Sequence, residues 1–325
     1  MSDTEACPAC ADEQSAGAAF CESCGRALAT GVTREVGTDC PSCGSTATVG
    51  ADSYCENCGM LAGRPRDHVE ADAAPVAAAV TDRGIRHRRN EDAMWLAVRG
   101  TDVDVVVCDG VSTSADPDVA SETAAEAAGK TLATIDEAGA GLESLVGAAV
   151  KAAGAAVALL PENGDPARLS SNPACTIVAA VVRGGEAAYG WVGDSRAYWV
   201  PRDGGTAEQL TEDDSWATHA IAMGADPQTA WNDSRAHAIT AWLGADAGIV
   251  RPRTGTLRPT TPGLLVLCSD GLWNYRTDPA AFAAAVHTAV QDNPDLLSAA
   301  RALVTLAVDA GGADNITVAL MPITP

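Results

Sequence analysis

The sequence predicts an α+β fold in which helices cover antiparallel β-sheets. Short runs rich in valine and other apolar residues fill the middle of the chain, and long alanine-rich helical stretches flank them. Successive strand runs stand close enough for hairpins, and the Gly184-Gly185 pair is typical of a tight hairpin turn. Hairpin connections favour antiparallel sheets over crossover-connected parallel ones.

The expected elements follow one another from residue 76 to the C-terminus. Strands are expected at 76–80, 93–98, 103–108, 175–183, 186–192, 196–200, 264–268 and 316–321, and helices at 119–135, 142–160, 280–290 and 296–308. Pro117 suits the opening turn of the first helix, with a cap at Asp116 or Asp118. Cys108, Cys175 and Cys268 stand alone in apolar runs, which predicts small buried side chains.

The first sixty residues carry a different pattern. Eight of the eleven cysteines form four C-x-x-C pairs, namely Cys7, Cys10, Cys21, Cys24, Cys40, Cys43, Cys55 and Cys58. In each half, ten or eleven residues separate one pair from the next, which indicates an internal duplication. Because two such pairs complete one tetrahedral site, residues 1–63 are predicted to form a double zinc ribbon with two structural Zn²⁺ ions. A disulfide framework is the alternative, disfavoured in a reducing compartment.

The chain is expected to divide into three parts. Residues 1–63 form the ribbons, residues 64–75 an exposed linker, and residues 76–325 the large domain. The linker is expected because this segment has two prolines and no hydrophobic period, and His68 within it is expected to be solvated.

Charge and hydropathy exclude several classes of protein. The formal net charge is −22, with 21 basic residues against 43 acidic ones, which disfavours nucleic-acid binding. Residues 1–63 contain nine acidic side chains and only Arg26 and Arg34, so the ribbons are expected to dock a protein rather than nucleic acid. No apolar run could cross a membrane and no export signal is visible, so a cytoplasmic protein is expected.

Acidic residues stand where apolar strands begin or end. These are Asp109, Asp194 and Asp270 after strands, and Glu91, Asp92 and Asp314 before them. Carboxylates brought together in this way repel one another and raise their pKa values unless a cation binds between them. Oxygen ligands of this kind suit Mg²⁺ or Mn²⁺. A single Asp-Gly turn is common, but five such sites in one domain, with the adjacent Glu91 and Asp92 counted as one, predict a metal centre.

The ordered motifs TDRG, NED, DG, GDSRAYW, LTEDDS, LCSDGLW and ADNITV resemble those of the PPM (type 2C) metal-dependent protein phosphatases. The resemblance covers residues 76–322 and implies two stacked antiparallel β-sheets flanked by helix pairs, an α-β-β-α sandwich. It implies that Asp109 bridges two metal ions, that the Gly110 carbonyl binds one of them, and that Asp270 and Asp314 complete the first site. Glu91 and Asp92 would hold the second ion, directly or through water. Asp194 would join Asp270 in a weaker third site.

The resemblance also implies an activity: hydrolysis of phosphoserine and phosphothreonine by direct attack of a metal-bridging water, without a phospho-enzyme. The substrates would be phosphorylated proteins, opposite a cognate kinase system. Residues 215–241 would form a variable flap beside the site.

The chain departs from the family pattern where the substrate phosphate is held. An arginine three residues before the Asn of the NED motif is replaced by His87, and either His87 or the neighbouring Arg88 could bind phosphate. Ser112 and Thr113 replace glycines next to Asp109 and Gly110, and Asp214 replaces a histidine that has a structural role. The metal ligands are complete, which favours an enzyme. The alternative is a catalytically weak pseudo-phosphatase that binds phosphoproteins.

Overall fold

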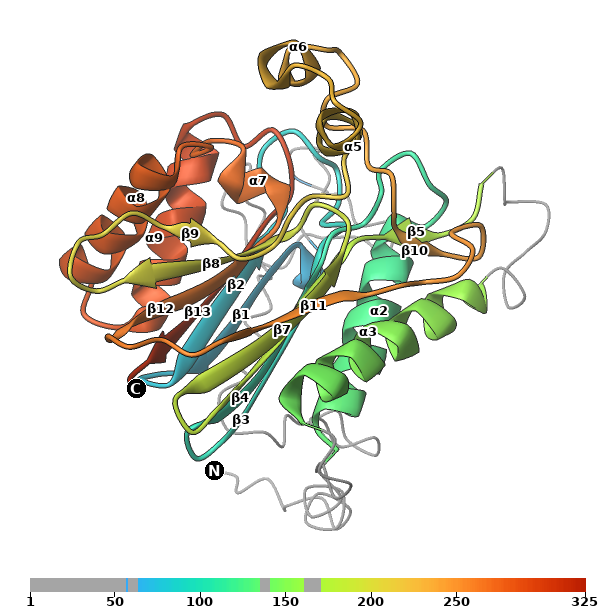
Figure 1. Cartoon of the computed structure of the whole chain (residues 1–325). Coiled ribbons are helices and arrows are strands. Elements are labelled where there is room, and N and C mark those ends of the chain that lie inside the picture. The colour runs from blue at the N-terminus through green and yellow to red at the C-terminus, as the bar shows by residue number, and fades with distance from the viewer. Residues whose placement is uncertain (1–56, 58–63, 135–140, 161–170) are drawn as a thin grey trace.

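The computed structural model of the chain describes residues 57, 64–134, 141–160 and 171–325 (Figure 1). The eight paired cysteines of the predicted zinc ribbons lie outside these residues. Within them, Cys108, Cys175 and Cys268 are fully buried free thiols, as the sequence predicts.

Two antiparallel sheets form the centre of the fold. The six-stranded sheet has the order β1-β2-β13-β12-β8-β9 and the five-stranded sheet the order β11-β7-β6-β4-β3. The strands of the first are β1 (His68–Ala73), β2 (Ala77–Asp82), β13 (Ile316–Ile323), β12 (Gly263–Cys268), β8 (Arg196–Pro201) and β9 (Glu208–Gln209). Those of the second are β11 (Arg253–Leu257), β7 (Glu186–Val192), β6 (Ile177–Arg183), β4 (Asp102–Cys108) and β3 (Ala93–Arg99). A short pair, β5 (Ala174–Cys175) and β10 (Leu243–Gly244), lies apart.

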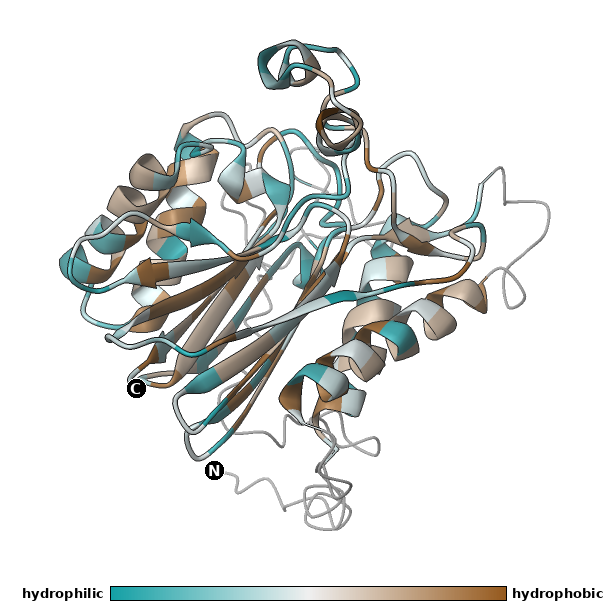
Figure 2. Ribbon diagram, in the orientation of Figure 1, coloured by the Kyte–Doolittle hydropathy of each residue, from teal (hydrophilic) through white to brown (hydrophobic). Residues whose placement is uncertain are grey.

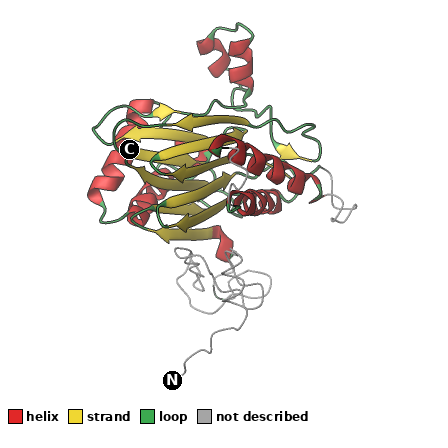
Figure 3. Ribbon diagram, turned by 60° about the horizontal axis from the view of Figure 1, so that its bottom comes forward, coloured by secondary structure: helices red, strands yellow, loops and turns green. Residues whose placement is uncertain are grey.

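A helix pair covers the outer face of each sheet. Helices α2 (Pro117–Leu132) and α3 (Leu142–Ala158) pack on the five-stranded sheet, and α8 (Pro279–Asp292) and α9 (Leu296–Asp309) pack on the six-stranded one. Figure 3 shows the strands lying between the helix pairs. The expected α-β-β-α sandwich is therefore confirmed for the described residues.

The alternation of side chains explains why the central strands are apolar throughout. In β12, Leu265 and Leu267 face the other sheet, while Leu264 and Val266 pack under α8 and α9. Because successive side chains point to opposite faces of a strand, a sheet covered on both sides needs apolar residues at every position. Figure 2 shows this hydrophobic character along the inner strands.

The segment 64–75 is not the exposed linker that the sequence suggested. Pro65–Asp67 form a 3₁₀ turn, and β1 pairs antiparallel with β2 along its whole length, from His68 opposite Asp82 to Ala73 opposite Ala77. The strand has no clear period because it lies at the sheet edge, where Glu70 is buried through an ion pair with Arg301. His68 is half-exposed, and its two ring nitrogens form hydrogen bonds with Asp82 and Glu70.

Other differences are local. The expected strand 175–183 is divided into β5 and β6 at Thr176, whose backbone N–H donates to the Asp109 carbonyl (2.7 Å) in the register that pairs β6 with β4. The edge strands β9, β10 and β11 were not expected, since they are short or polar. Helices α5 (Trp216–Ala222) and α6 (Pro227–Trp231) project from the sandwich around their own small alanine cluster (Figure 1).

In the part of the chain that the structure describes, none of the helices is both long and apolar enough to span a bilayer.

Candidate metal centre

One edge of the sandwich gathers the acidic residues that the sequence singled out. Asp109 directly follows β4, and Asp92 directly precedes β3; since Ala93 pairs with Cys108, these two carboxylates stand next to each other in register. The six-stranded sheet supplies Asp270, which opens the short helix α7 (Asp270–Trp273) after β12, and Asp314, which precedes β13. Asp194 follows β7.

Electrostatics show that these carboxyl groups share one site. Burial, with repulsion from Asp314 and Asp270, raises the pKa of Asp92 to about 7. Burial and the nearby Asp270 raise the pKa of Asp194 to about 8, and the pKa of Asp109 lies well above its usual range for the same kinds of reason. These groups cannot all be ionised together without a cation.

Hydrogen bonds hold Asp92 and Asp270 while leaving one oxygen of each without a partner. Asp92 Oδ2 accepts from Ser269 Oγ (2.8 Å) and Thr317 Oγ1 (2.7 Å), and Asp270 Oδ2 accepts from the Asn274 amide (3.1 Å). The buried Oδ1 atoms of Asp92 and Asp270 have no hydrogen-bond partner. A buried unpaired carboxylate oxygen is costly, so these two atoms are natural cation ligands.

The described side chains do not already stand in ligand geometry: no group of three or more acidic, histidine or cysteine residues among them is arranged to hold an ion. Burial and repulsion from Asp314 raise the pKa of Asp270 to about 7, against smaller effects of Asp109 and Asn274 that lower it. A divalent cation would offset this repulsion, so the donor set fits a metal ion.

Gly110 and Glu91 lie together at the mouth of the site. The Gly110 N–H donates to the Glu91 carbonyl (3.1 Å), and a Cβ at position 110 would come within 2.6 Å of the Glu91 and Pro117 carbonyl oxygens. Glycine is therefore required there. Ser112, a departure from the family pattern, donates its hydroxyl to Glu91 Oε2 (2.6 Å).

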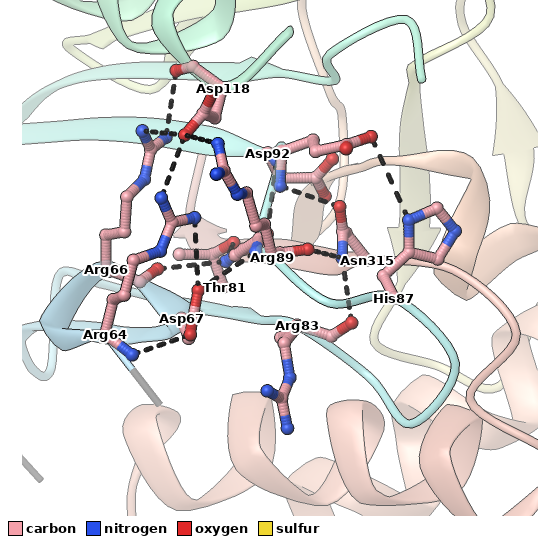
Figure 4. Close-up of polar contacts among 12 residues, drawn as sticks. Arg64, Arg66, Asp67, Thr81, Arg83, His87, Arg89, Asp92, Asp118 and Asn315 are labelled. Carbon is pink, nitrogen blue, oxygen red and sulfur yellow. Dashed lines mark hydrogen bonds and ion pairs between the residues drawn. The ribbon is translucent and has the colours of Figure 1, made fainter. Parts of the chain in front are cut away.

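His87 faces the acidic site and Arg88 does not contact it. His87 Nε2 lies 3.2 Å from Asp314 Oδ1, and Nδ1 lies 3.9 Å from Glu91 Oε2. Arg88 is exposed and forms no ion pair with the residues described. Figure 4 shows Arg83 turned away from His87, and Arg89 directed toward Asp118.

Asn315 connects Glu91 with the segment 83–89, a role that the sequence did not predict. Its Oδ1 accepts from the Glu91 N–H (2.7 Å), while its Nδ2 donates to the carbonyls of Arg83 (2.8 Å) and Arg89 (2.9 Å) (Figure 4). The only available signal was its position directly after Asp314 in the DNITV motif. Ser269 and Thr317, which hold Asp92, gave no signal of their own.

A second network supports Asp194. The Trp273 indole donates to the Asp194 carbonyl (3.0 Å), and the Arg196 guanidinium lies 3.4 Å from the centre of the Trp273 ring. Arg196 also forms a buried two-point ion pair with Asp213 (2.8 and 2.6 Å). The neighbouring Asp214 accepts from the Gly193 N–H (2.9 Å), in line with the structural role expected of it.

Comparison with known proteins gives a consistent result. The family model described as "Protein phosphatase 2C" matches residues 83–305. The serine/threonine protein phosphatase PstP of Mycobacterium tuberculosis is 30% identical over 250 residues, which cover 74% of this chain and 43% of the relative. The chain thus spans less than half the length of this curated relative.

Solved structures agree in fold. The catalytic domain of PstP in complex with two manganese ions superposes with a TM-score of 0.60 at 28% identity, over 76% of this chain and 97% of that one. The serine/threonine phosphatase Stp1 of Staphylococcus aureus gives a TM-score of 0.65 at 26% identity, over 77% and 95% of the two chains.

Proposed function

Because the chain belongs to the protein phosphatase 2C family, we propose that it is a metal-dependent protein serine/threonine phosphatase that hydrolyses phosphoserine and phosphothreonine. One observation carries this proposal: five aspartates from distant parts of the chain gather at one edge of the sandwich, where burial and repulsion between carboxylates raise the pKa values of Asp92, Asp109, Asp194 and Asp270 beside Asp314. Such an arrangement is unfavourable unless a cation binds.

The donor set fits two divalent ions, Mn²⁺ or Mg²⁺, as in the PstP structure with two manganese ions. Asp109 would contact both, Gly110 would contribute its carbonyl, and Asp270 and Asp314 would complete the first set. Glu91 and Asp92 would serve the second ion, and Asp194 with Asp270 a weaker third. When bound, the ions would lower the pKa of a water nucleophile and offset charge on the phosphate.

The protein's own residues would do the positioning. Ser269 and Thr317 hold Asp92 so that its unpaired Oδ1 remains available, and Ser112 orients Glu91. We assign the substrate phosphate to His87, because it faces Asp314 and Glu91 whereas Arg88 makes no contact there. An imidazolium in this place would donate a hydrogen bond to a phosphate oxygen.

The cysteine pairs complete the proposal for the whole chain. Two structural Zn²⁺ ions held by residues 1–63 would form docking modules for a partner protein, and the phosphatase would act opposite a kinase system. Elemental analysis is expected to give about two zinc ions per chain. A fully folded N-terminal segment without metal would contradict the ribbons and leave the phosphatase unaffected.

The activity is tested by hydrolysis of p-nitrophenyl phosphate and of a phosphothreonine peptide with Mn²⁺. We expect turnover by the wild type and a loss of about a hundredfold or more in Asp109→Asn and Asp270→Asn. Asp292→Asn, an exposed carboxylate at the end of α8, is the matched control and should keep its activity. Absence of turnover by the folded wild type over a range of divalent metals would refute the enzyme and favour a phosphoprotein-binding pseudo-phosphatase.

A further inference from the structure

The segment between β2 and Glu91 concentrates positive charge in an acidic protein. Residues 83–89, which we name the arginine loop, contain Arg83, Arg86, Arg88 and Arg89 around His87, with no acidic residue. The whole chain has 21 lysines and arginines against 43 acidic residues, so seven consecutive positions hold four of its few cations. Such a concentration next to an acidic site calls for a physical explanation.

The arginine loop is fixed in place at both ends and in its middle. The Asn315 side chain donates to the carbonyls of Arg83 and Arg89, and the N–H groups of Ile85 (2.9 Å) and Arg86 (3.2 Å) donate to the Gly312 carbonyl. Gly84 has a φ of +71°, and a Cβ there would collide with the Asp314 carbonyl. These contacts hold the loop against the segment that carries Asp314.

The cations of this region differ in whether they have partners. Arg64 and Arg66 pair with Asp118 at 3.1 and 3.4 Å, and Arg89 approaches the same carboxylate at 4.0 Å (Figure 4). Arg86 and Arg88, one on each side of His87, are exposed and form no ion pair with any described residue. Their charges are therefore available to an external anion.

We propose that the arginine loop selects phosphorylated segments that carry further anionic side chains close to the phosphoresidue. The anion is a carboxylate or a second phosphate, the two chemistries that guanidinium groups bind best. This inference rests on the proposed phosphatase function, since it places the phosphoresidue at His87. Peptide positions lie about 3.3–3.6 Å apart in an extended chain, so an anion within three residues of the phosphoresidue lies within roughly 10 Å of it.

The net charge of the molecule opposes this selectivity, so it must come from the charges of the arginine loop itself. A net charge of −22 repels acidic peptides at long range, and that repulsion is screened beyond about 10 Å at 0.1 M salt. Two unpaired guanidinium groups on a fixed loop would reverse the sign of the interaction beside the site. Neutral or basic flanking residues would gain nothing from them.

The test compares phosphothreonine peptides of one length that differ only in flanking residues: glutamate, glutamine, or a second phosphothreonine. The readout is the ratio of kcat/KM for each anionic peptide to that for the glutamine peptide on the same enzyme. We expect a ratio of about five for wild type, falling toward one in Arg86→Gln/Arg88→Gln and at 0.5 M salt. The two anionic peptides distinguish carboxylate from phosphate as the preferred source.

The matched control is Arg202→Gln/Arg258→Gln, which removes the same charge from exposed positions far from Asp194. Arg202 follows the distal end of β8, and Arg258 pairs with Glu186 at the start of β7. A wild-type ratio of one for both anionic peptides, or an equal fall in this control, would overturn the inference. Equilibrium binding of the same peptides to Asp270→Asn gives the same comparison without turnover, so failure of the loop and failure of the phosphatase are distinguished.

Discussion

At the scale of single residues, His87 is the most informative position of the site. It stands where the resemblance to the family implies an arginine, and it lies 3.2 Å from Asp314 Oδ1. A histidine offers one donor to a phosphate oxygen, whereas arginine offers a planar fork that binds two oxygens at once. We therefore expect the histidine to hold a substrate phosphate less tightly than an arginine would.

We expect His87→Ala to lower kcat/KM for a phosphothreonine peptide by about 10- to 100-fold, the value of one hydrogen bond between charged groups. His87→Arg is expected to keep or raise kcat/KM, because the guanidinium restores a two-point contact. Steady-state kinetics of both variants with saturating Mn²⁺ decides this. A His87→Arg enzyme as inactive as His87→Ala would show that the imidazole has another role.

At the scale of elements, β1 shows how an edge strand can escape detection in the sequence. It is held by polar side chains: His68 Nδ1 bonds Asp82 Oδ2 (2.6 Å), its Nε2 bonds Glu70 Oε1 (2.9 Å), and Arg301 of α9 pairs with Glu70. The bond to Asp82 is the main reason why the pKa of His68 rises to about 9, with Glu70 adding to it. The ion pair with Arg301 lowers the pKa of Glu70.

These contacts predict a pH-dependent contribution to stability. Because the pKa of His68 is raised from 6.5 to about 9, its contribution is complete below pH 6.5 and is lost as the pH rises through 9. His68→Gln should destabilise the protein at pH 6 and much less at pH 10. The side chain is 44% exposed, so we expect about 1 kcal/mol or less. Denaturant unfolding at the two pH values measures it; an equal loss at both would contradict the ion pair.

At the scale of the whole molecule, the two sheets create a site that neither contains alone. The five-stranded sheet brings Asp92, Asp109 and Asp194, and the six-stranded sheet brings Asp270 and Asp314. Their shared edge forces carboxylates together, and this repulsion makes the fold sensitive to pH when no metal is bound.

The direction in which metal-free stability changes with pH follows from the raised pKa values. Asp92 and Asp194 keep their protons in the metal-free folded chain up to about pH 7 and 8, whereas the unfolded chain loses them near 3.8. Metal-free stability should therefore fall as the pH rises from about 4 to 8. Metal binding displaces these protons, so Mn²⁺ should raise Tm more at pH 8 than at pH 6, by roughly 3 °C for each pH unit and carboxyl group.

Thermal melts with Mn²⁺ or with a chelator, at pH 6, 7 and 8, measure this difference. Because the effect of His68 is present with and without metal, it cancels in the comparison. A metal-induced rise in Tm that is the same at all three pH values would contradict the argument.

The sequence by itself determined the layers of this protein and the members of its acidic site. Continuous apolar runs such as 264–268 require burial on both faces, and acidic residues at their ends mark where the chain leaves the core. Both are local properties of the chain, which is why they could be predicted. The same reasoning missed β1: its strand partner β2 follows directly, but the buried Glu70 depends on Arg301, 231 residues further along the chain.

Only the tertiary structure decided which side chains meet. Asn315 connects Glu91 to both ends of the arginine loop across more than two hundred residues, and Ser269 after β12 and Thr317 in β13 converge on Asp92. It also placed His87, rather than Arg88, against the carboxylates. Hydrogen bonds between distant segments depend on sheet register and loop path, which no local pattern of residues encodes.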